Sequence, residues 1–238
     1  MWDDHRLLNQ VASALFALAA LVVLYGAVML VIRMPAFAIR EVHVSGDIRH
    51  TTREQVTSIA DELRGTFFTV DLERARTGFE KLPWVRKAQL RREWPDLLEV
   101  TLEEHVPLAR WRDIGVVNTH GELFQAATDA TLPVFVGPDG TSEEMTGHYV
   151  QFRDTLAAIG RAPAEVRLSG RRAWNLRLDD GRVLELGRQD VVGRLARFAA
   201  VYPRIAGQLP DQRHRIDLRY PNGFAVRVPG LRWGERAA

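Results

Sequence analysis

The sequence has 238 residues, of which 46% are hydrophobic and 26% are charged, and its formal net charge is +2. This composition predicts a globular chain and excludes a disordered one. A net charge so close to zero does not favour nucleic-acid binding, which usually needs a concentrated basic face. Because the chain has no cysteine, disulfides, thiolate metal ligands and a cysteine nucleophile are also excluded.

An uncharged apolar stretch, ASALFALAALVVLYGAVMLVI, occupies residues 12–32. As a helix it would be about 31 Å long, which matches the hydrocarbon core of a bilayer. We therefore expect a tail over residues 1–11 and a transmembrane helix over residues 12–33. A cleaved signal peptide is the alternative, because Ala36-Phe37-Ala38 resembles a cleavage site. The long apolar stretch and the acidic Asp3 and Asp4 weigh against it, since signal peptides have apolar regions of roughly 7–15 residues.

The charges that flank this stretch do not decide its orientation, since Arg6 precedes it and Arg33 and Arg40 follow it. A short tail before the span and a large domain behind it are commonly arranged with the N-terminus in the cytoplasm. That arrangement is our expectation.

Residues 37–106 show the order strand, helix, helix, strand, strand. Thr52 and Gln55 have the spacing of a capping box for the first helix, and Asp71 is the expected cap of the second. Each helix has one apolar stripe, so both should cover the same face of a small three-stranded sheet. Basic residues on the second strand should pair with Glu99 and Glu103 across the sheet, and contact with lipid headgroups is the less favoured alternative. This basic set is Arg86, Lys87, Arg91 and Arg92.

Residues 107–230 predict a mixed β domain with flanking helices, and residues 231–238 a loose tail, so that the whole chain belongs to the α+β class. Asp179-Asp180-Gly181 is typical of a hairpin turn. The last two strands are expected at residues 215–220 and 224–228. Five tryptophans lie outside the apolar stretch and the tail before it, and alternation predicts that most of them are core residues. They are Trp84, Trp94, Trp111, Trp174 and Trp233.

We find no pattern that predicts catalysis, a cofactor or a metal site. The seven histidines are scattered, and none has the spacing of a zinc-binding helix. The acidic pairs Glu103-Glu104, Glu143-Glu144 and Asp179-Asp180 fall at a strand end, a helix start and a turn. Carboxylates at such places are usually solvated or cap backbone amides. This leaves binding as the expected activity.

The last strand ends at Pro229-Gly230, so it can lie at a sheet edge and accept a strand from a partner. A strand capped by the chain's own tail is an equally good interpretation of the residues alone.

Several motifs, in the same order and spacing, resemble the bacterial cell-division family FtsQ/DivIB. In the first domain they are Gly65-Thr66-Phe67-Phe68-Thr69-Val70-Asp71, Leu82-Pro83-Trp84-Val85 and Arg91-Arg92-Glu93-Trp94-Pro95-Asp96, which resemble the POTRA module of that family. In the second domain they are Arg171-Arg172-Ala173-Trp174 and Asp217-Leu218-Arg219-Tyr220-Pro221-Asn222-Gly223. Together with the apolar helix, the resemblance covers nearly the whole chain.

The resemblance implies a non-enzymatic, single-pass scaffold of the division septum in the inner membrane, with both domains in the periplasm. It implies that the second domain binds the FtsB–FtsL pair by strand addition, that FtsW, FtsI and FtsN are further partners, and that early and late division proteins are linked. Arg171 would pair with a partner carboxylate, and Tyr220 would pack on an apolar side chain. The chain departs from the best-known relatives at Val228, where they have a tryptophan. The implied binding residues are Arg171, Arg172, Arg219, Tyr220, Asn222, Gly223, Phe224 and Val226.

Two alternatives belong to other classes of protein. One is an outer-membrane assembly or secretion component, since such proteins also use POTRA modules, although no barrel sequence follows here. The other is a membrane-anchored cell-wall hydrolase.

Overall fold

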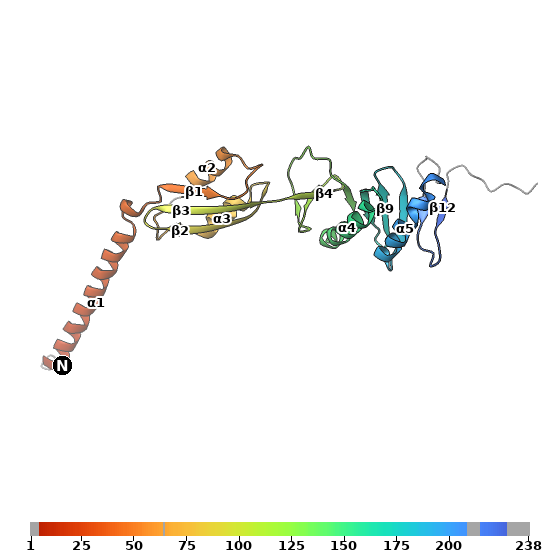
Figure 1. Cartoon of the computed structure of the whole chain (residues 1–238). Coiled ribbons are helices and arrows are strands. Elements are labelled where there is room, and N and C mark those ends of the chain that lie inside the picture. The colour runs from red at the N-terminus through yellow and green to blue at the C-terminus, as the bar shows by residue number, and fades with distance from the viewer. Residues whose placement is uncertain (1–4, 64, 209–214, 228–238) are drawn as a thin grey trace, which may run out of the picture. The chain divides into compact units, whose positions relative to one another are not determined.

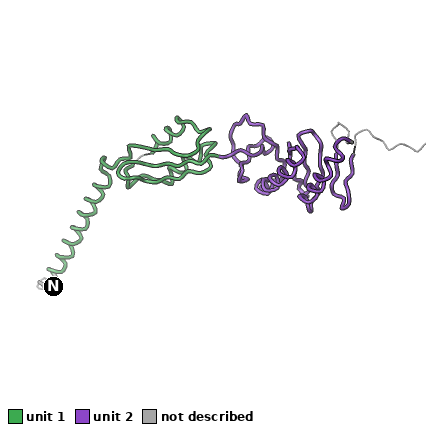
Figure 2. The backbone as a smooth tube through the Cα atoms, in the orientation of Figure 1, with its two compact units in different colours: residues 1–104 green, residues 105–238 purple. Residues whose placement is uncertain are grey.

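The computed structural model describes residues 5–63, 65–208 and 215–227. The chain divides into two compact units, residues 1–104 and residues 105–238 (Figure 2). Each unit has its own hydrophobic core.

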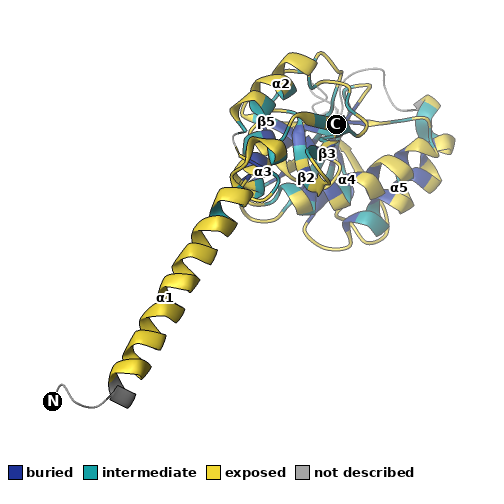
Figure 3. Cartoon of the chain, turned by 90° about the vertical axis from the view of Figure 1, so that its left-hand side faces the viewer, coloured by how far each residue is buried: buried dark blue, intermediate teal, exposed yellow. Residues whose placement is uncertain are grey.

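Unit 1 begins with α1 (His5–Ile32), a helix that is exposed along nearly its whole length (Figure 3). Its segment Leu8–Ile32 has 25 residues and is long and apolar enough to cross a membrane. In water no protein surface would cover an isolated apolar helix of this length, whereas a lipid bilayer would cover it. The helix therefore suggests a single-pass membrane anchor.

The rest of unit 1 is a small sheet with two helices (Figure 1). The strand order is β1-β3-β2, with β1 parallel and β2 antiparallel to the central β3. This is the predicted order of strand, helix, helix, strand, strand. The elements are η1 (Pro35–Phe37), β1 (Glu41–Ser45), α2 (Arg53–Glu62), α3 (Leu72–Glu80), β2 (Val85–Glu93) and β3 (Leu97–Glu104).

The predicted helix caps are confirmed. The Thr52 hydroxyl accepts a bond from the Gln55 amide at 3.3 Å, and the Gln55 side chain accepts one from the Thr52 amide at 3.0 Å. The Asp71 carboxylate accepts the Arg74 amide at 3.0 Å. These side chains satisfy donors that the first turn of a helix leaves free, which is why the helices begin at these positions.

Both helices contribute to one core, so they cover one face of the sheet as predicted. Val56 and Ile59 of α2 and the fully buried Phe79 of α3 pack in the same cluster as Leu98 and Val100 of β3.

The predicted pairing across β2 and β3 is confirmed for Arg86, whose guanidinium lies 2.7 Å from the Glu103 carboxylate. Arg91 stands opposite Glu99 in the register. The prediction for Trp94 is wrong, because this residue is 61% exposed. Since β2 ends at Glu93, the strand's alternation no longer determines where residue 94 points.

Unit 2 contains a mixed sheet in which the described strands follow the order β12-β11-β10-β9-β8-β7-β4-β5-β6. Three of its pairings are parallel, β4 with β7, β7 with β8 and β10 with β11. The strands are β4 (Pro107–Trp111), β5 (Gly115–Asn118), β6 (Leu123–Phe124), β7 (Val134–Val136), β8 (Pro163–Leu168), β9 (Trp174–Leu178), β10 (Val183–Gly187), β11 (Arg215–Asp217) and β12 (Ala225–Arg227).

Two helices, α4 (Ser142–Ala157) and α5 (Val191–Ile205), cover one face of this sheet, and η2 (Ala206–Gln208) follows α5. Phe152 of α4 and Phe198 of α5 are almost fully buried against inward residues such as Leu176 and Leu184. The alternate residues of the same strands form the opposite, polar face. The predicted α+β class is therefore confirmed.

The last two strands are shorter than predicted. β11 ends at Asp217, because the chain beyond this residue no longer pairs with β12. The Leu218 amide still bonds to the Glu185 carbonyl of β10 at 2.9 Å. β12 begins at Ala225, after Phe224 has turned towards the core. The predicted end of this strand at Val228, Trp233 and the predicted tail lie outside the described residues.

Candidate partner-binding edge

β12 lies at one end of the sheet of unit 2. Among the strands that the structure describes it pairs with β11 alone, with Val226 opposite Ile216. The outer side of its backbone therefore carries amide and carbonyl groups that an additional strand could bond. From the sequence alone, a strand at this edge could either accept a partner strand or be capped by the chain's own tail.

Buried apolar residues hold the β11–β12 ribbon in place. Ile216 is fully buried and Leu218 is 4% exposed, so β11 is anchored on both sides of Asp217. Phe224 packs edge-on against Phe198 of α5, with ring centroids 6.0 Å apart. The intervening residues 219–223 form the exposed turn that joins the two strands.

The residues implied in binding lie along this ribbon, most of them exposed. Tyr220 is 55% exposed and Val226 36% exposed, and Asn222 and Gly223 lie between them at the surface. Phe224 differs, because its ring supports the ribbon from the core side. Four of the predicted residues thus lie exposed along one ribbon.

Arg219 is fixed by two carboxylates. Its guanidinium makes bonds of 2.6 and 2.8 Å to the Asp217 carboxylate and lies 3.6 Å from Glu185. The hydrogen bond from the Arg219 side chain is the main reason why the pKa of Asp217 lies below its usual value, although partial burial opposes it.

Arg171 and Arg172 are neighbours in the chain but take different positions. Arg172 has a φ of +65° in the turn before β9, and its guanidinium bonds to the Glu144 carboxylate of α4. Arg171 has no hydrogen bond or ion pair with any residue that the structure describes, and its side chain is exposed. The structure therefore brings Arg171, but not the side chain of Arg172, towards the ribbon.

Arg171 lines a shallow groove of about 500 Å³ with three other arginines, Arg188, Arg194 and Arg219. We call it the arginine groove. Arg194 donates to the Leu186 carbonyl at 2.6 Å, and Arg188 is exposed and, like Arg171, has no partner among the described residues. Gly187 (φ +76°) forms part of the wall, because a Cβ there would lie 2.8 Å from an Arg194 nitrogen. Two free guanidinium groups make this groove suited to carboxylates.

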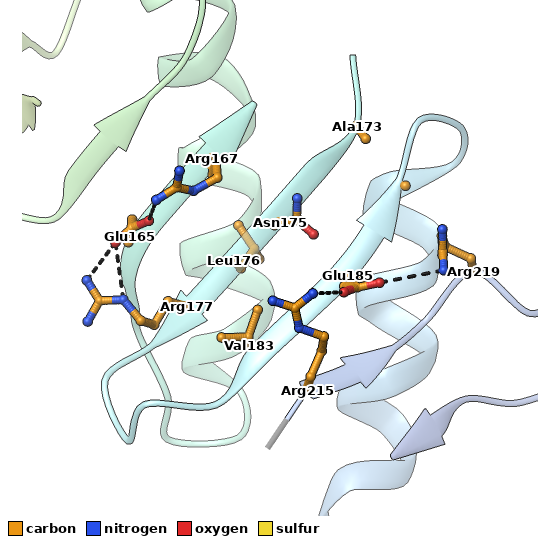
Figure 4. A pocket seen from close by; sticks show the side chains of 11 residues that line it. Glu165, Arg167, Ala173, Asn175, Leu176, Arg177, Val183, Glu185, Arg215 and Arg219 are labelled. Atoms are coloured by element: carbon orange, nitrogen blue, oxygen red, sulfur yellow. Dashed lines mark hydrogen bonds and ion pairs between the residues drawn. The ribbon is translucent and has the colours of Figure 1, made fainter. Parts of the chain in front are cut away.

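The arginine groove continues onto the polar face of the sheet, where Glu165 and Glu185 are each held between two arginines (Figure 4). Glu165 pairs at 2.7 Å with both Arg167 and Arg177. Partial burial raises the pKa of Glu165, but the hydrogen bonds and charges of these two arginines outweigh it and hold that pKa below its usual value.

This polar face was not predicted from the sequence. The signal was the alternate polar positions of β8, β9 and β10, which include Glu165, Asn175 and Glu185. Within the described residues, on this face or any other, no group of three or more potential metal ligands lies together.

Two family models match the chain. Residues 37–105 match the POTRA domain of the FtsQ type, and residues 109–219 match the C-terminal domain of the cell division protein FtsQ/DivIB. The chain belongs to the FtsQ/DivIB family. Several relatives named cell division protein FtsQ are similar over almost their full length. That of Nitrosospira multiformis is 45% identical and covers 95% of this chain and 99% of its own. That of Burkholderia pseudomallei is 43% identical, covering 98% and 96%, and that of Bordetella pertussis is 34% identical, covering 97% and 94%.

Membership in the FtsQ/DivIB family assigns the chain to cell division, as the resemblance of its motifs predicted. The matched C-terminal domain ends at residue 219, so it includes β11 and Arg219 but not β12. The ribbon that carries the candidate binding residues therefore lies partly beyond the matched domain.

Proposed function

We propose that this chain is a non-enzymatic scaffold of the division septum, with its N-terminus in the cytoplasm, α1 in the inner membrane and both units in the periplasm. Unit 2 binds the FtsB–FtsL pair through addition of a strand to β12, and the chain links early division proteins to FtsW, FtsI and FtsN. Family membership supports the role in division. The single observation that carries the binding mode is the position of β12 at the end of the sheet formed by the described strands.

Strand addition suits this edge for a physical reason. The incoming strand would satisfy the outward amide and carbonyl groups of β12, so main-chain hydrogen bonds supply affinity that does not depend on the partner's side chains. Specificity must then come from side chains beside the edge. The exposed ring of Tyr220 offers an apolar contact, and tyrosine and arginine are frequent anchors of protein interfaces.

Charge favours an acidic partner segment. Arg171 and Arg188 are exposed and have no described partner, so a carboxylate entering the arginine groove would form ion pairs without breaking existing ones. Arg219 is already held by Asp217 and can share its remaining donors. Arg172 would contribute at the margin, because binding a partner requires it to leave Glu144 or to share its guanidinium.

The side-chain contacts are tested with the double variant Arg171→Glu, Tyr220→Ala in the full chain, using pull-down and titration with the FtsB–FtsL pair. We expect affinity to fall about 100-fold or more, because both changes remove interface anchors and one reverses a charge. Arg153→Glu is the matched control, since it reverses an exposed charge on α4, away from the ribbon. Wild-type binding by the double variant would show that the proposed site is wrong.

Strand addition itself is tested with Ala225→Pro and Val226→Pro. In an antiparallel pair, neighbouring residues direct their amides to opposite sides, so one of these prolines removes a bond to β11 and the other an outward donor. We expect one variant to keep the thermal unfolding midpoint of unit 2 and yet lose binding. If the stably folded variant binds like the wild type, the partner does not pair with β12.

A further inference from the structure

Unit 1 carries a cluster of four aromatic rings at the end of its sheet where β2 turns into β3. Phe37, Phe67, Phe68 and Trp94 contact one another, with ring centroids 5.5 Å apart for Phe37 and Phe68, 5.6 Å for Phe37 and Trp94, and 5.5 Å for Phe67 and Trp94. We call these four residues the aromatic patch. It is separate from the core of the unit, whose buried cluster contains none of them.

Three segments distant in sequence meet in this patch. The Phe67 amide bonds to the Phe37 carbonyl, and Ala38 pairs with Thr66 in an isolated antiparallel bridge. The Arg40 amide bonds to the Asp96 carbonyl at 2.9 Å, which ties the chain leaving η1 to the turn that contains Trp94. The patch is therefore fixed by backbone bonds and is not a chance contact of side chains.

Two of the four rings of the patch, Phe68 and Trp94, are exposed to solvent, whereas Phe37 and Phe67 are half-buried. Trp94 is 61% and Phe68 46% exposed, and the preceding Met34 is 40% exposed. By contrast, the core ring Phe79 of the same unit is fully buried. A contiguous group of exposed aromatic side chains usually marks a surface that binds a partner or a membrane.

The position of the patch next to α1 favours a membrane. Phe37 follows Ile32 by five residues, and even a fully extended chain of that length spans at most about 18 Å. The link is tighter than this limit, because the buried Thr66 donates its hydroxyl to the Ile32 carbonyl at 2.8 Å. Thus the loop that carries Phe67 and Phe68 bonds directly to the last turn of the helix.

We propose that the aromatic patch inserts into the headgroup region of the bilayer that α1 spans, so that lipid covers Phe68 and Trp94. Aromatic side chains concentrate at this depth, where an apolar ring and a polar edge are both accommodated. The proposal depends on α1 being a membrane anchor but not on binding of FtsB–FtsL. A protein partner that covers the patch is the competing occupant.

The test uses the full chain, purified and reconstituted alone in vesicles of phosphatidylethanolamine and phosphatidylglycerol, with and without brominated acyl chains that quench tryptophan. Trp94→Phe is compared with Trp84→Phe. Trp84 precedes β2 and Trp94 follows it, so the control lies at the other end of the same strand, stacked on His50. We expect Trp94→Phe to remove a lipid-quenched component of the fluorescence and Trp84→Phe to leave it unchanged.

A second pair of reporters avoids dependence on a variant that loses Trp94. Phe68→Trp adds an indole within the patch, and Asp47→Trp adds one in the exposed loop after β1, beyond the other end of that strand. Added fluorescence that bromolipids quench at position 68 but not at 47 supports the proposal. Equal quenching at both positions, or none at 68 and 94 in vesicles that hold no other protein, overturns it and leaves a protein partner as the occupant.

Flotation of the same vesicles tests anchoring by α1 separately from docking of the aromatic patch. Chains that float with the vesicles at high pH are anchored by α1, so failure of quenching in floated chains refutes the docking of the patch and not the anchor. Failure to float would instead refute the anchor.

Discussion

Replacement of Glu104 by glutamine is expected to loosen the segment between β1 and α2. The Glu104 side chain is 7% exposed and stands at the end of β3. It accepts backbone amides of Arg49 at 3.0 Å, His50 at 3.1 Å and Thr51 at 2.7 Å. A carboxylate that accepts several amides is stabilised in its charged form, and a neutral glutamine cannot replace that charge.

The size of the effect follows from the pKa of Glu104, which lies at about 2 instead of its usual 4.5. Partial burial raises this pKa. The Thr51 side chain, the amides of Arg49 and Thr51 and the His50 side chain all lower it, and together they outweigh the burial. The amide bonds are the firmest of these causes, since the Thr51 hydroxyl has no hydrogen-bond partner among the described residues. Each pH unit corresponds to about 1.4 kcal/mol, so the charged form contributes about 3 kcal/mol to folding.

The pH dependence has a definite sign. Because the pKa of Glu104 is lower in the folded state, its contribution is complete above about pH 4.5 and is lost as the pH falls towards 2. Glu104→Gln should therefore destabilise unit 1 at neutral pH and make it less sensitive to acid in this window.

Hydrogen exchange of the amides of residues 49–51, read by mass spectrometry at neutral pH, measures the effect directly. About 3 kcal/mol corresponds to roughly 100-fold faster exchange in Glu104→Gln. Glu103→Gln is the control, because Glu103 is half exposed, and loss of its pair with Arg86 should change exchange little. Unchanged protection in Glu104→Gln would refute the view that this carboxylate holds the segment.

Two further predictions concern the core and the arginine groove. Phe79→Ala should reduce the free energy of unfolding of unit 1 by about 3–5 kcal/mol because it empties a fully buried site, whereas Phe68→Ala, at an exposed ring, should cost far less; urea unfolding compares the two. Gly187→Ala should destabilise unit 2 by about 1–3 kcal/mol because its φ is +76°, and it should weaken FtsB–FtsL binding by displacing Arg194. Calorimetry measures the loss of stability and titration the loss of affinity. If the destabilised variant kept full affinity, the arginine groove would not contribute to binding.

Much of unit 1 could be predicted because its signals are local. The capping pair Thr52 and Gln55 and the cap Asp71 specify where the two helices begin, and the alternation of Leu98, Val100 and Leu102 identifies the buried face of β3. Trp94 was assigned wrongly because alternation was extended one residue past the strand, into a turn whose partners come from residues 37 and 67.

The candidate site was less predictable because it depends on contacts between distant segments. Nothing in the adjacent pair Arg171 and Arg172 distinguishes a free guanidinium from one paired with Glu144, 28 residues earlier in the chain. Likewise, the edge position of β12 follows from the strand order of the sheet, which periodicity does not reveal. The resemblance of motifs named these residues, but only the structure places them on one ribbon and beside one groove.

The way Arg219 is held has a consequence for how fast a partner could leave. A long flexible side chain normally loses rotamer entropy when a complex forms, by about 2 kcal/mol for arginine. Asp217 and Glu185 already restrict this guanidinium in the free chain. An arriving acidic segment would thus meet a preorganised donor, and cutting this tether with Asp217→Asn should shorten the lifetime of the complex more than it slows the encounter.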